Sequence, residues 1–273
     1  MQNAALKSSA LADSSHMTFQ FRSINNLKYD EARHLSTTVF DSAGGLLTKI
    51  TAVRKGNVRL GIKEKRVVIW TTPEQFDDLL YMGIGMMADL VILPVPPGTY
   101  DYVIVDVSDG WAAKDGKVYP VIFPENRMIL HFDPAVIVGE QLSPDLVFNI
   151  DVSHSFVPVK GRSAYIFKPV VQVQNVTTSG SLSGWVYDQS GNPVLNALVY
   201  VNIDGNMYPT YTFSQPYVDP LGVVYYPGQY WIPGIPAGTY TAYAEKDGYV
   251  SDSTQVSILK GNFYYQNFVL KSK

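Results

Sequence analysis

The amino-acid sequence predicts an all-β protein of two β-sandwich domains in series, the second with seven strands and the first with one short helix. Three observations support this fold class. The phrase Val95–Tyr100 (VPPGTY) returns as Ile235–Tyr240 (IPAGTY), and in both copies proline and glycine favour a tight turn before a strand. Short apolar or alternating runs recur between turn residues along the chain. After residue 178, about seven such runs follow one another at the spacing typical of a sandwich.

The first domain is predicted to cover 25–176. Its first strands are expected over 17–23, 39–53 and 58–70, because apolar residues alternate or cluster there. Gly44-Gly45 is expected to form a hairpin turn, since glycine pairs favour the turns that join antiparallel strands.

A short helix is expected from Thr72 to Leu80. Thr72, Pro73 and Gln75 are the residue types of a helix N-terminus, and apolar residues follow at helical spacing. Strands then resume, with tight turns at Asp109-Gly110 and Asp115-Gly116. These strands are expected within 89–94, 99–110, 117–123, 127–133, 145–157 and 164–176.

Ser, Thr and Gly dominate a predicted linker, 177–183, which precedes the second domain, 184–273. Composition changes at this point, since 13 of the 19 tyrosines lie after residue 178. Residues 1–24 are expected to form an N-terminal tail with a candidate donor strand. Strands of the second domain are expected within 181–188, 197–204, 207–213, 223–232, 238–249, 254–261 and 263–270.

Composition excludes several function classes. The net charge is −3 and only 16% of residues are charged, so the chain lacks the basic footprint of a nucleic-acid-binding protein. It has no cysteine, which removes disulfides and thiolate chemistry together. No apolar run is long enough to span a bilayer. The sequence therefore predicts no nucleic-acid partner, no membrane span and no cofactor.

Short motifs in the second domain resemble a known family. They occur in this order: Gly184–Asp188 (GWVYD), Gly191–Val194 (GNPV), Ala197–Tyr200 (ALVY), Gly228–Ile232 (GQYWI), Ile235–Tyr240, Gly248-Tyr249 and Phe268–Leu270 (FVL). Their order and spacing resemble the carboxypeptidase regulatory-like family, a transthyretin-like seven-stranded sandwich, over nearly all of 180–271. The resemblance implies a non-catalytic accessory or surface module. A Tyr/Pro-rich segment between Val201 and Gly228 departs from the family pattern.

The first domain is similar, over about 58–174, to a family of unknown function from exported bacterial and archaeal proteins. The residues that carry this resemblance are Trp70, Asp78–Leu80, Pro97–Tyr100 and Phe167–Val173. That family often precedes a regulatory-like sandwich. It offers no catalytic residue to transfer.

Two pairs of histidine and aspartate are candidates for a metal or general-base site. His131 and Asp133 share one face of a strand, and Asp151 lies three residues before His154. We favour surface or edge hydrogen bonds, because motifs this short are common by chance. Asp106, Asp109 and Asp115 offer oxygen ligands for Ca²⁺, but solvated turn carboxylates are the preferred interpretation.

An aromatic segment is the strongest functional candidate. It contains too many rings for one core, which favours a subunit interface or, alternatively, a platform for sugar stacking. A third interpretation is that half of the rings are core residues of a strand. Its residues are Tyr208, Tyr211, Tyr217, Tyr225, Tyr226, Tyr230 and Trp231. Asn175 begins the only glycosylation sequon, Asn175–Thr177, which can equally arise by chance.

The function expected from the sequence is that of a non-catalytic extracellular protein, a self-assembling subunit of a surface fibre or pilus. Sandwich domains polymerise when a neighbour donates a strand to an open edge. Here the donor contacts are expected from Thr18, Phe19, Phe21 and Ile24. The expected partners are copies of the chain or other surface proteins. The alternative is an adhesin or carbohydrate-binding module with glycan partners.

Overall fold

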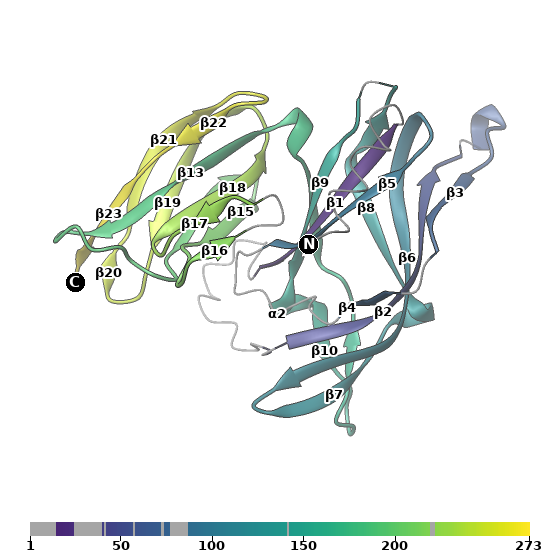
Figure 1. The fold of residues 1–273 in the computed structure, drawn as a ribbon, viewed down its shortest axis with the longest axis horizontal. Coiled ribbons are helices and arrows are strands. Elements are labelled where there is room, and N and C mark those ends of the chain that lie inside the picture. The colour runs from purple at the N-terminus through teal and green to yellow at the C-terminus, as the bar shows by residue number, and fades with distance from the viewer. Residues whose placement is uncertain are drawn as a thin grey trace.

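The computed structural model describes residues 15–24, 40, 42–56, 58–71, 74–76, 87–140, 142–218 and 222–273. Within these ranges, regular structure is almost entirely β, and the longest helix, α2 (Val152–Ser155), has four residues. The predicted all-β class is confirmed. Figure 1 shows two groups of strands side by side, which we call the first module (β1 to β12) and the second module (β13 to β23).

Two sheets make up the described part of the first module. The smaller sheet has the order β12-β9-β1-β5, with bounds β1 His16–Ile24, β5 Met87–Pro94, β9 Asp145–Asp151 and β12 Val171–Asn175. The larger sheet runs β10-β11-β7-β6-β2-β3, with β4 also on β2 and β8 on β6. Its strands are β2 Ser42–Arg54, β3 Lys65–Trp70, β4 Glu74–Phe76, β6 Gly98–Lys114, β7 Lys117–Ile122, β8 Arg127–Val138, β10 Phe156–Pro158 and β11 Tyr165–Phe167.

The two sheets bury one apolar core between them. Phe148 of β9 is fully buried, and its ring stacks on Phe19 of β1 with centroids 5.4 Å apart. Across the core, the ring of Phe132 on β8 lies 6.3 Å from Phe148. Alternating side chains of facing sheets meet in this way in a β-sandwich, so the first module is a β-sandwich.

Strand β6 bends where the sequence predicted a turn. It pairs first with β8, from Gly98 to Asp106, and then with β7, from Gly110 to Lys114. Asp109 has a φ of 50° inside this strand, so the predicted turn at Asp109-Gly110 is wrong. At Asp115-Gly116 the turn is confirmed, because both residues have positive φ between β6 and β7.

The position of β2 shows that the predicted Gly44-Gly45 turn and the predicted short helix are wrong where the structure describes them. Gly44 and Gly45 lie inside it, next to an irregularity in its pairing with β6, and not in a hairpin turn. Glu74–Phe76 forms β4, which pairs with Gly45–Leu47, so the predicted helix is wrong at these residues. The other residues of its range, 72–73 and 77–80, lie outside the described residues. Long-range pairing with β2 overrides the local helix signal.

The predicted strand over 58–70 is confirmed only in its second half. Val58–Leu60 is the 3-10 helix η1, and β3 begins at Lys65. Two other 3-10 helices lie in the described chain, η2 (Pro124–Asn126) and η3 (Val176–Thr178).

The second module has two main sheets over the described residues. One has the order β18-β13-β23-β20, with β22 also on β13, and the other β15-β14-β19-β21; β16 and β17 form a small hairpin. Their bounds are β13 Gly180–Asp188, β14 Leu198–Ile203, β15 Asn206–Tyr211, β16 Tyr217–Val218, β17 Val224–Tyr225, β18 Gln229–Ile235, β19 Gly238–Glu245, β20 Tyr249–Val250, β21 Asp252–Ile258, β22 Phe263–Tyr265 and β23 Phe268–Ser272.

Separate clusters of buried apolar side chains fill the two modules. One extends from Met17 to Phe167 and the other from Leu182 to Leu270. Between them, Gln172 Nε2 donates a hydrogen bond to the carbonyl of Met207 (3.2 Å). Strand β13 begins at Gly180 and so includes part of the predicted linker. The domain boundaries at single-residue level stay a prediction.

Candidate functional site

The outer face of the β18-β13-β22 sheet carries a row of aromatic side chains, which we call the aromatic face. On β13, Leu182 and Val186 enter the core, and alternation points Ser183, Trp185 and Tyr187 to the opposite face. Pairing continues this face onto both neighbours, because Ser183 pairs with Trp231 of β18 and with Tyr265 of β22. The aromatic face consists of Trp185, Tyr187, Trp231, Phe263 and Tyr265.

Exposure and ring contacts describe this face further. Phe263 is 77% exposed and Tyr265 64% exposed. The rings of Trp185 and Tyr187 are nearly parallel, with centroids 5.9 Å apart. Such rings present a large apolar area with few polar atoms, which suits contact with another molecule.

A second group of rings continues from the aromatic face toward the β16–β17 hairpin. Tyr225 lies 6.2 Å from Trp231 and 6.1 Å from Tyr217, measured between ring centroids. Phe213 is buried and lies 4.9 Å from Tyr225. The hairpin is therefore fixed to the module by stacked rings.

The structure divides the aromatic segment that the sequence singled out. Tyr230 is fully buried, and Tyr208 packs against the core, whereas Tyr226 is 52% exposed. Of the remaining four, Tyr217, Tyr225 and Trp231 form the stacked group described above, and Tyr211 ends β15. Sequence reasoning missed Trp185, Tyr187, Phe263 and Tyr265, although the alternation of β13 and β22 was the signal that could have found them.

Two polar side chains beside the aromatic face, Ser183 and Gln229, are already engaged. Ser183 Oγ donates to the carbonyl of Tyr264 (3.4 Å), and Gln229 Oε1 accepts a hydrogen bond from the backbone N–H of Tyr226 (2.9 Å). The face therefore offers a ligand apolar contact and few hydrogen bonds.

Strand β1 holds the predicted donor residues inside the first module. It lies between β5, to which it is antiparallel, and β9, to which it is parallel. Phe19 and Phe21 are buried in the core, and Thr18 is buried as well. Ile24 ends the strand opposite Asp151 in the register with β9. Whether this strand is exchanged between copies stays a prediction.

Asp151 and His154 come together as one of the predicted pairs. His154 Nδ1 lies 2.8 Å from Asp151 Oδ2, and the backbone N–H of His154 also donates to the carboxylate (3.2 Å). Asp151 is 1% exposed and the His154 side chain 29% exposed, so the contact is a partly buried hydrogen bond. In the other pair, His131 packs against Tyr102, with ring centroids 5.2 Å apart.

The buried carboxylate of Asp151 contributes to the pKa of Tyr211 in the second module. Burial, with a smaller contribution from Asp151, raises the pKa of Tyr211 to about 12. In the folded chain Tyr211 therefore keeps its proton at a pH where the unfolded chain has lost it. The stabilisation is complete below pH 10.0, the ordinary pKa, and is lost as the pH rises toward 12.

The raised pKa of Tyr211 predicts how the stability of the chain falls at alkaline pH. Since one pKa unit corresponds to about 1.4 kcal/mol, deprotonation of Tyr211 removes about 2–3 kcal/mol of the free energy of unfolding. We expect Tyr211→Phe to flatten the decline in stability above pH 10, measured by urea denaturation across the range. Tyr226→Phe, at a half-exposed ring, is the control and keeps the wild-type slope. Equal slopes for all three proteins would contradict the prediction.

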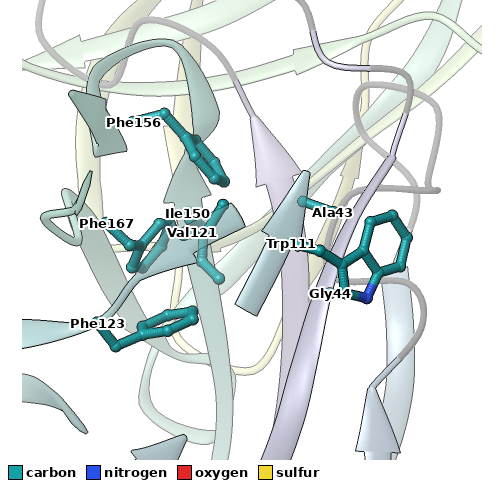
Figure 2. Close-up of a pocket in the computed structure, with 8 residues that line it drawn as sticks. All are labelled: Ala43, Gly44, Trp111, Val121, Phe123, Ile150, Phe156 and Phe167. Atoms are coloured by element: carbon teal, nitrogen blue, oxygen red, sulfur yellow. The ribbon is translucent and has the colours of Figure 1, made fainter. Parts of the chain in front are cut away.

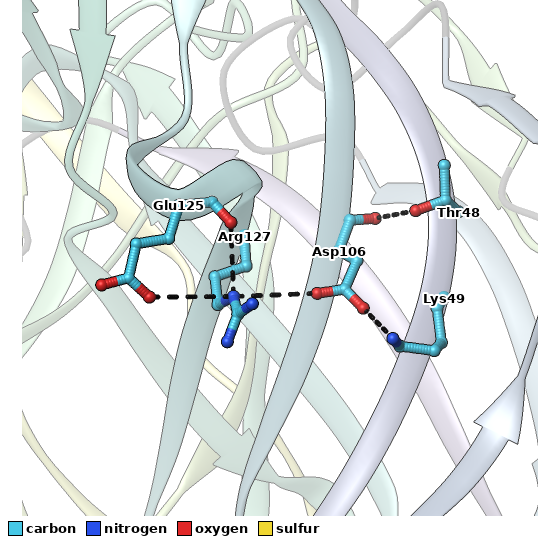
Figure 3. A network of polar contacts seen from close by, with 5 residues as sticks. All are labelled: Thr48, Lys49, Asp106, Glu125 and Arg127. Carbon is cyan, nitrogen blue, oxygen red and sulfur yellow. Dashed lines mark hydrogen bonds and ion pairs between the residues drawn. The ribbon is translucent and has the colours of Figure 1, made fainter.

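Three aspartates, Asp106, Asp109 and Asp115, were expected to be solvated turn carboxylates rather than calcium ligands. Asp106 lies within β6 and forms ion pairs instead. Asp106 lies 2.6 Å from Lys49 Nζ and 3.9 Å from Arg127 Nε (Figure 3). These cations neutralise the carboxylate that a Ca²⁺ ion requires. Asp109 accepts a hydrogen bond from Ser108 Oγ (3.1 Å), and Asp115 lies in the β6–β7 turn. Across the described ranges, no group of three or more His, Asp or Glu side chains is arranged to hold a metal ion.

Two hollows in the described chain are candidate binding sites. The first, about 10 Å³, is a small apolar cavity between Trp111 and Phe156 (Figure 2), with room for about one water molecule. The second is a cleft of about 510 Å³ between the modules, bordered by Phe132, Asn175 and Tyr208. Asn175 Oδ1 is buried and has no hydrogen-bond partner among the described residues. Glycosylation of Asn175 stays a prediction.

In the part of the chain that the structure describes, no helix is both long and apolar enough to cross a membrane. No protein-family model matches the chain, and no curated protein matches its sequence. The two family resemblances of the sequence, including the transthyretin-like one, therefore stay predictions.

Several solved structures of surface proteins resemble the chain at a distance. The TIE protein of Bacillus anthracis has 10% identity and a TM-score of 0.28, with 85% of this chain and 35% of that chain covered. GBS52, the minor pilin of Streptococcus agalactiae, has 12% identity and a TM-score of 0.26, with 94% and 96% covered. The shaft pilin SpaA of Lactobacillus rhamnosus GG has 10% and 0.23, with 95% and 98% covered. This chain thus spans about a third of the TIE protein. At scores this low, these resemblances carry no weight for function.

Proposed function

We propose that this chain is a non-catalytic extracellular structural protein, a subunit of a surface fibre or pilus whose copies are joined by strand exchange. The observation that carries the proposal is the position of β1. This strand lies near the N-terminal end of the chain and fills an interior place in a sheet whose other strands come much later in the sequence.

Removing β1 would open the sheet along its length. Among the described strands, β5 pairs only with β1, and β9 would keep β12 as its partner. Both strands that flank the gap would then present unpaired backbone groups, which readily accept another strand. The apolar side chains Met17, Phe19 and Phe21 would leave an empty row in the core.

A second copy can fill this gap with the same contacts. The hydrogen bonds and buried side chains of β1 are identical whether the strand belongs to the same chain or to a neighbour. Concentration and the reach of the connecting segment then decide between the two arrangements. Heterologous donation of this kind produces open chains of subunits, as a fibre requires.

The test uses cysteines, because the native chain has none. Thr18 of β1 faces Ile92 of β5, and the backbone N–H of Thr18 bonds to Pro144 on the opposite side. Thr18 and Ile92 therefore form a non-hydrogen-bonded pair, in which the side chains are closest and can be bridged by a disulfide. Thr18→Cys and Ile92→Cys are placed on separate chains that carry different tags, refolded together and oxidised.

Donation in trans is expected to give a disulfide-linked dimer that carries both tags. The matched control pairs Thr18→Cys with Val118→Cys, at a side chain on β7 that is 70% exposed, and is expected to give no such dimer. A third protein with both Thr18→Cys and Ile92→Cys in one chain reports the arrangement within a chain. If only this third protein forms the disulfide, strand exchange is excluded.

The alternative function, carbohydrate binding by an adhesin, draws on the aromatic face. Rings on a flat sheet suit the apolar face of a sugar, but a sugar site also needs polar groups that orient the ligand. The side chains of Ser183 and Gln229 are engaged within the module. This alternative is therefore less well supported than assembly of copies.

A further inference from the structure

We propose that the aromatic face is a contact between two copies of this chain, packed face to face about a two-fold axis. The inference rests on the proposed function in so far as copies assemble. Its contacts lie in the second module, however, and do not involve β1.

The β18-β13-β22 sheet is apolar on both faces. Its inner face supplies core residues such as Leu182 and Tyr230, which are fully buried. Its outer face carries the aromatic rings, and Phe263 is the most exposed aromatic side chain of the second module. A sheet face that is exposed to solvent normally carries polar residues. A second apolar face therefore indicates a surface that another molecule covers.

Charge identifies the class of partner. The outward positions of β13, β18 and β22 hold Ser, Gln, Pro and aromatic residues, with no charged side chain. On the neighbouring β23, the charged Lys271 lies two residues after Val269. A charged partner gains nothing on such a face, whereas an identical copy meets it without repulsion. Depletion of charge and enrichment in Tyr, Trp and Phe are the composition of the centre of a protein interface.

The size of the face is sufficient for a dimer. A fully buried aromatic side chain covers about 150–250 Å². Phe263 is 77% exposed, Tyr265 64% and the neighbouring Val269 48%. With the half-buried rings of the aromatic face, each copy offers on the order of 600 Å². Two copies then bury about 1,200 Å², at the lower end of the size of specific interfaces.

The shape of the face also suits a two-fold contact. Ser183 lies between Tyr265 and Trp231 in the strand register, so a small side chain separates two large ones. In an isologous contact the rings of one copy can pack beside this small side chain of the other.

The experiment separates this contact from strand exchange. The Thr18→Cys/Ile92→Cys chain is oxidised so that β1 is fixed within its own sheet, and the locked monomer is purified. Its self-association is measured by sedimentation equilibrium at concentrations up to roughly 100 μM, where weak interfaces associate. We expect a concentration-dependent dimer.

Substitutions on the aromatic face then test the contact. In the locked chain, Phe263→Lys/Tyr265→Lys is expected to weaken dimerisation at least about tenfold, because four like charges meet across the two-fold axis. Val118→Lys, on the exposed position of β7, adds the same kind of charge elsewhere and is expected to leave the dimer intact. Circular dichroism verifies that each variant is folded.

Three results would overturn the inference. They are a locked chain that stays monomeric, a dimer that Phe263→Lys/Tyr265→Lys leaves unchanged, and a monomer that binds a glycan array through the aromatic face. None of these results bears on strand exchange, because the locked chain cannot exchange β1. Equally, failure of the two-tag disulfide experiment would leave the aromatic contact standing.

Discussion

Replacing Phe148 with alanine is expected to lower the free energy of unfolding of the first module by about 3–5 kcal/mol. The ring of Phe148 is fully buried and lies 5.4 Å from Phe19, 5.1 Å from Phe21 and 6.3 Å from Phe132, between centroids. It thus joins β1 to the facing sheet. Truncation removes these contacts and leaves a cavity that the rigid strands cannot close.

Urea denaturation and amide hydrogen exchange measure this effect. Exchange read by mass spectrometry separates β1 and β9 from the strands of the second module, so the loss can be assigned to the first module. Val118→Ala, at an exposed side chain of β7, is the control and is expected to change stability by less than about 0.5 kcal/mol. A loss below about 1 kcal/mol for Phe148→Ala would show that Phe148 does not hold the two sheets together.

The sequence predicted strands better than it predicted turns. Alternation identified β1 and β13, because buried and exposed residues follow with a period of two. Asp115-Gly116 and Asp109-Gly110 are the same dipeptide, yet one closes a hairpin and the other lies inside β6. Only pairing with distant strands distinguishes them, and a local pattern does not contain that information.

The candidate site was predictable only in part for the same reason. Tyr230 and Trp231 are neighbours in sequence, but alternation sends one into the core and the other outward. Phe263 and Tyr265 join the aromatic face because β22 runs parallel to β13. Alternation within β22 can single out Phe263 and Tyr265, but the sequence carries no local signal of the pairing that brings them beside β13. The predicted aromatic segment therefore included buried rings and omitted exposed ones.

Replacing Gly184 with alanine is expected to destabilise the second module by about 3 kcal/mol, the upper end of the cost of overpacking. A Cβ at Gly184 would overlap the backbone carbonyl of Gln266. That carbonyl also accepts a hydrogen bond from Tyr230 Oη (2.6 Å), and Tyr230 pairs with Gly184 across the sheet. Burial raises the pKa of Tyr230, so the hydroxyl keeps the proton that it donates.

Gly184 and Tyr230 should therefore act as one unit around Gln266. Tyr230→Phe alone leaves a buried carbonyl without its donor and is expected to cost about 1–3 kcal/mol. In the Gly184→Ala chain the carbonyl is already displaced, so Tyr230→Phe should cost less by about 1 kcal/mol or more, as a double-mutant cycle of urea midpoints reports. Gly191→Ala, where the added Cβ meets no atom but φ is 83°, isolates the backbone cost of about 1 kcal/mol. Additive losses at 184 and 230 would mean that the Gln266 carbonyl keeps its bond to Tyr230 and that the strain lies elsewhere.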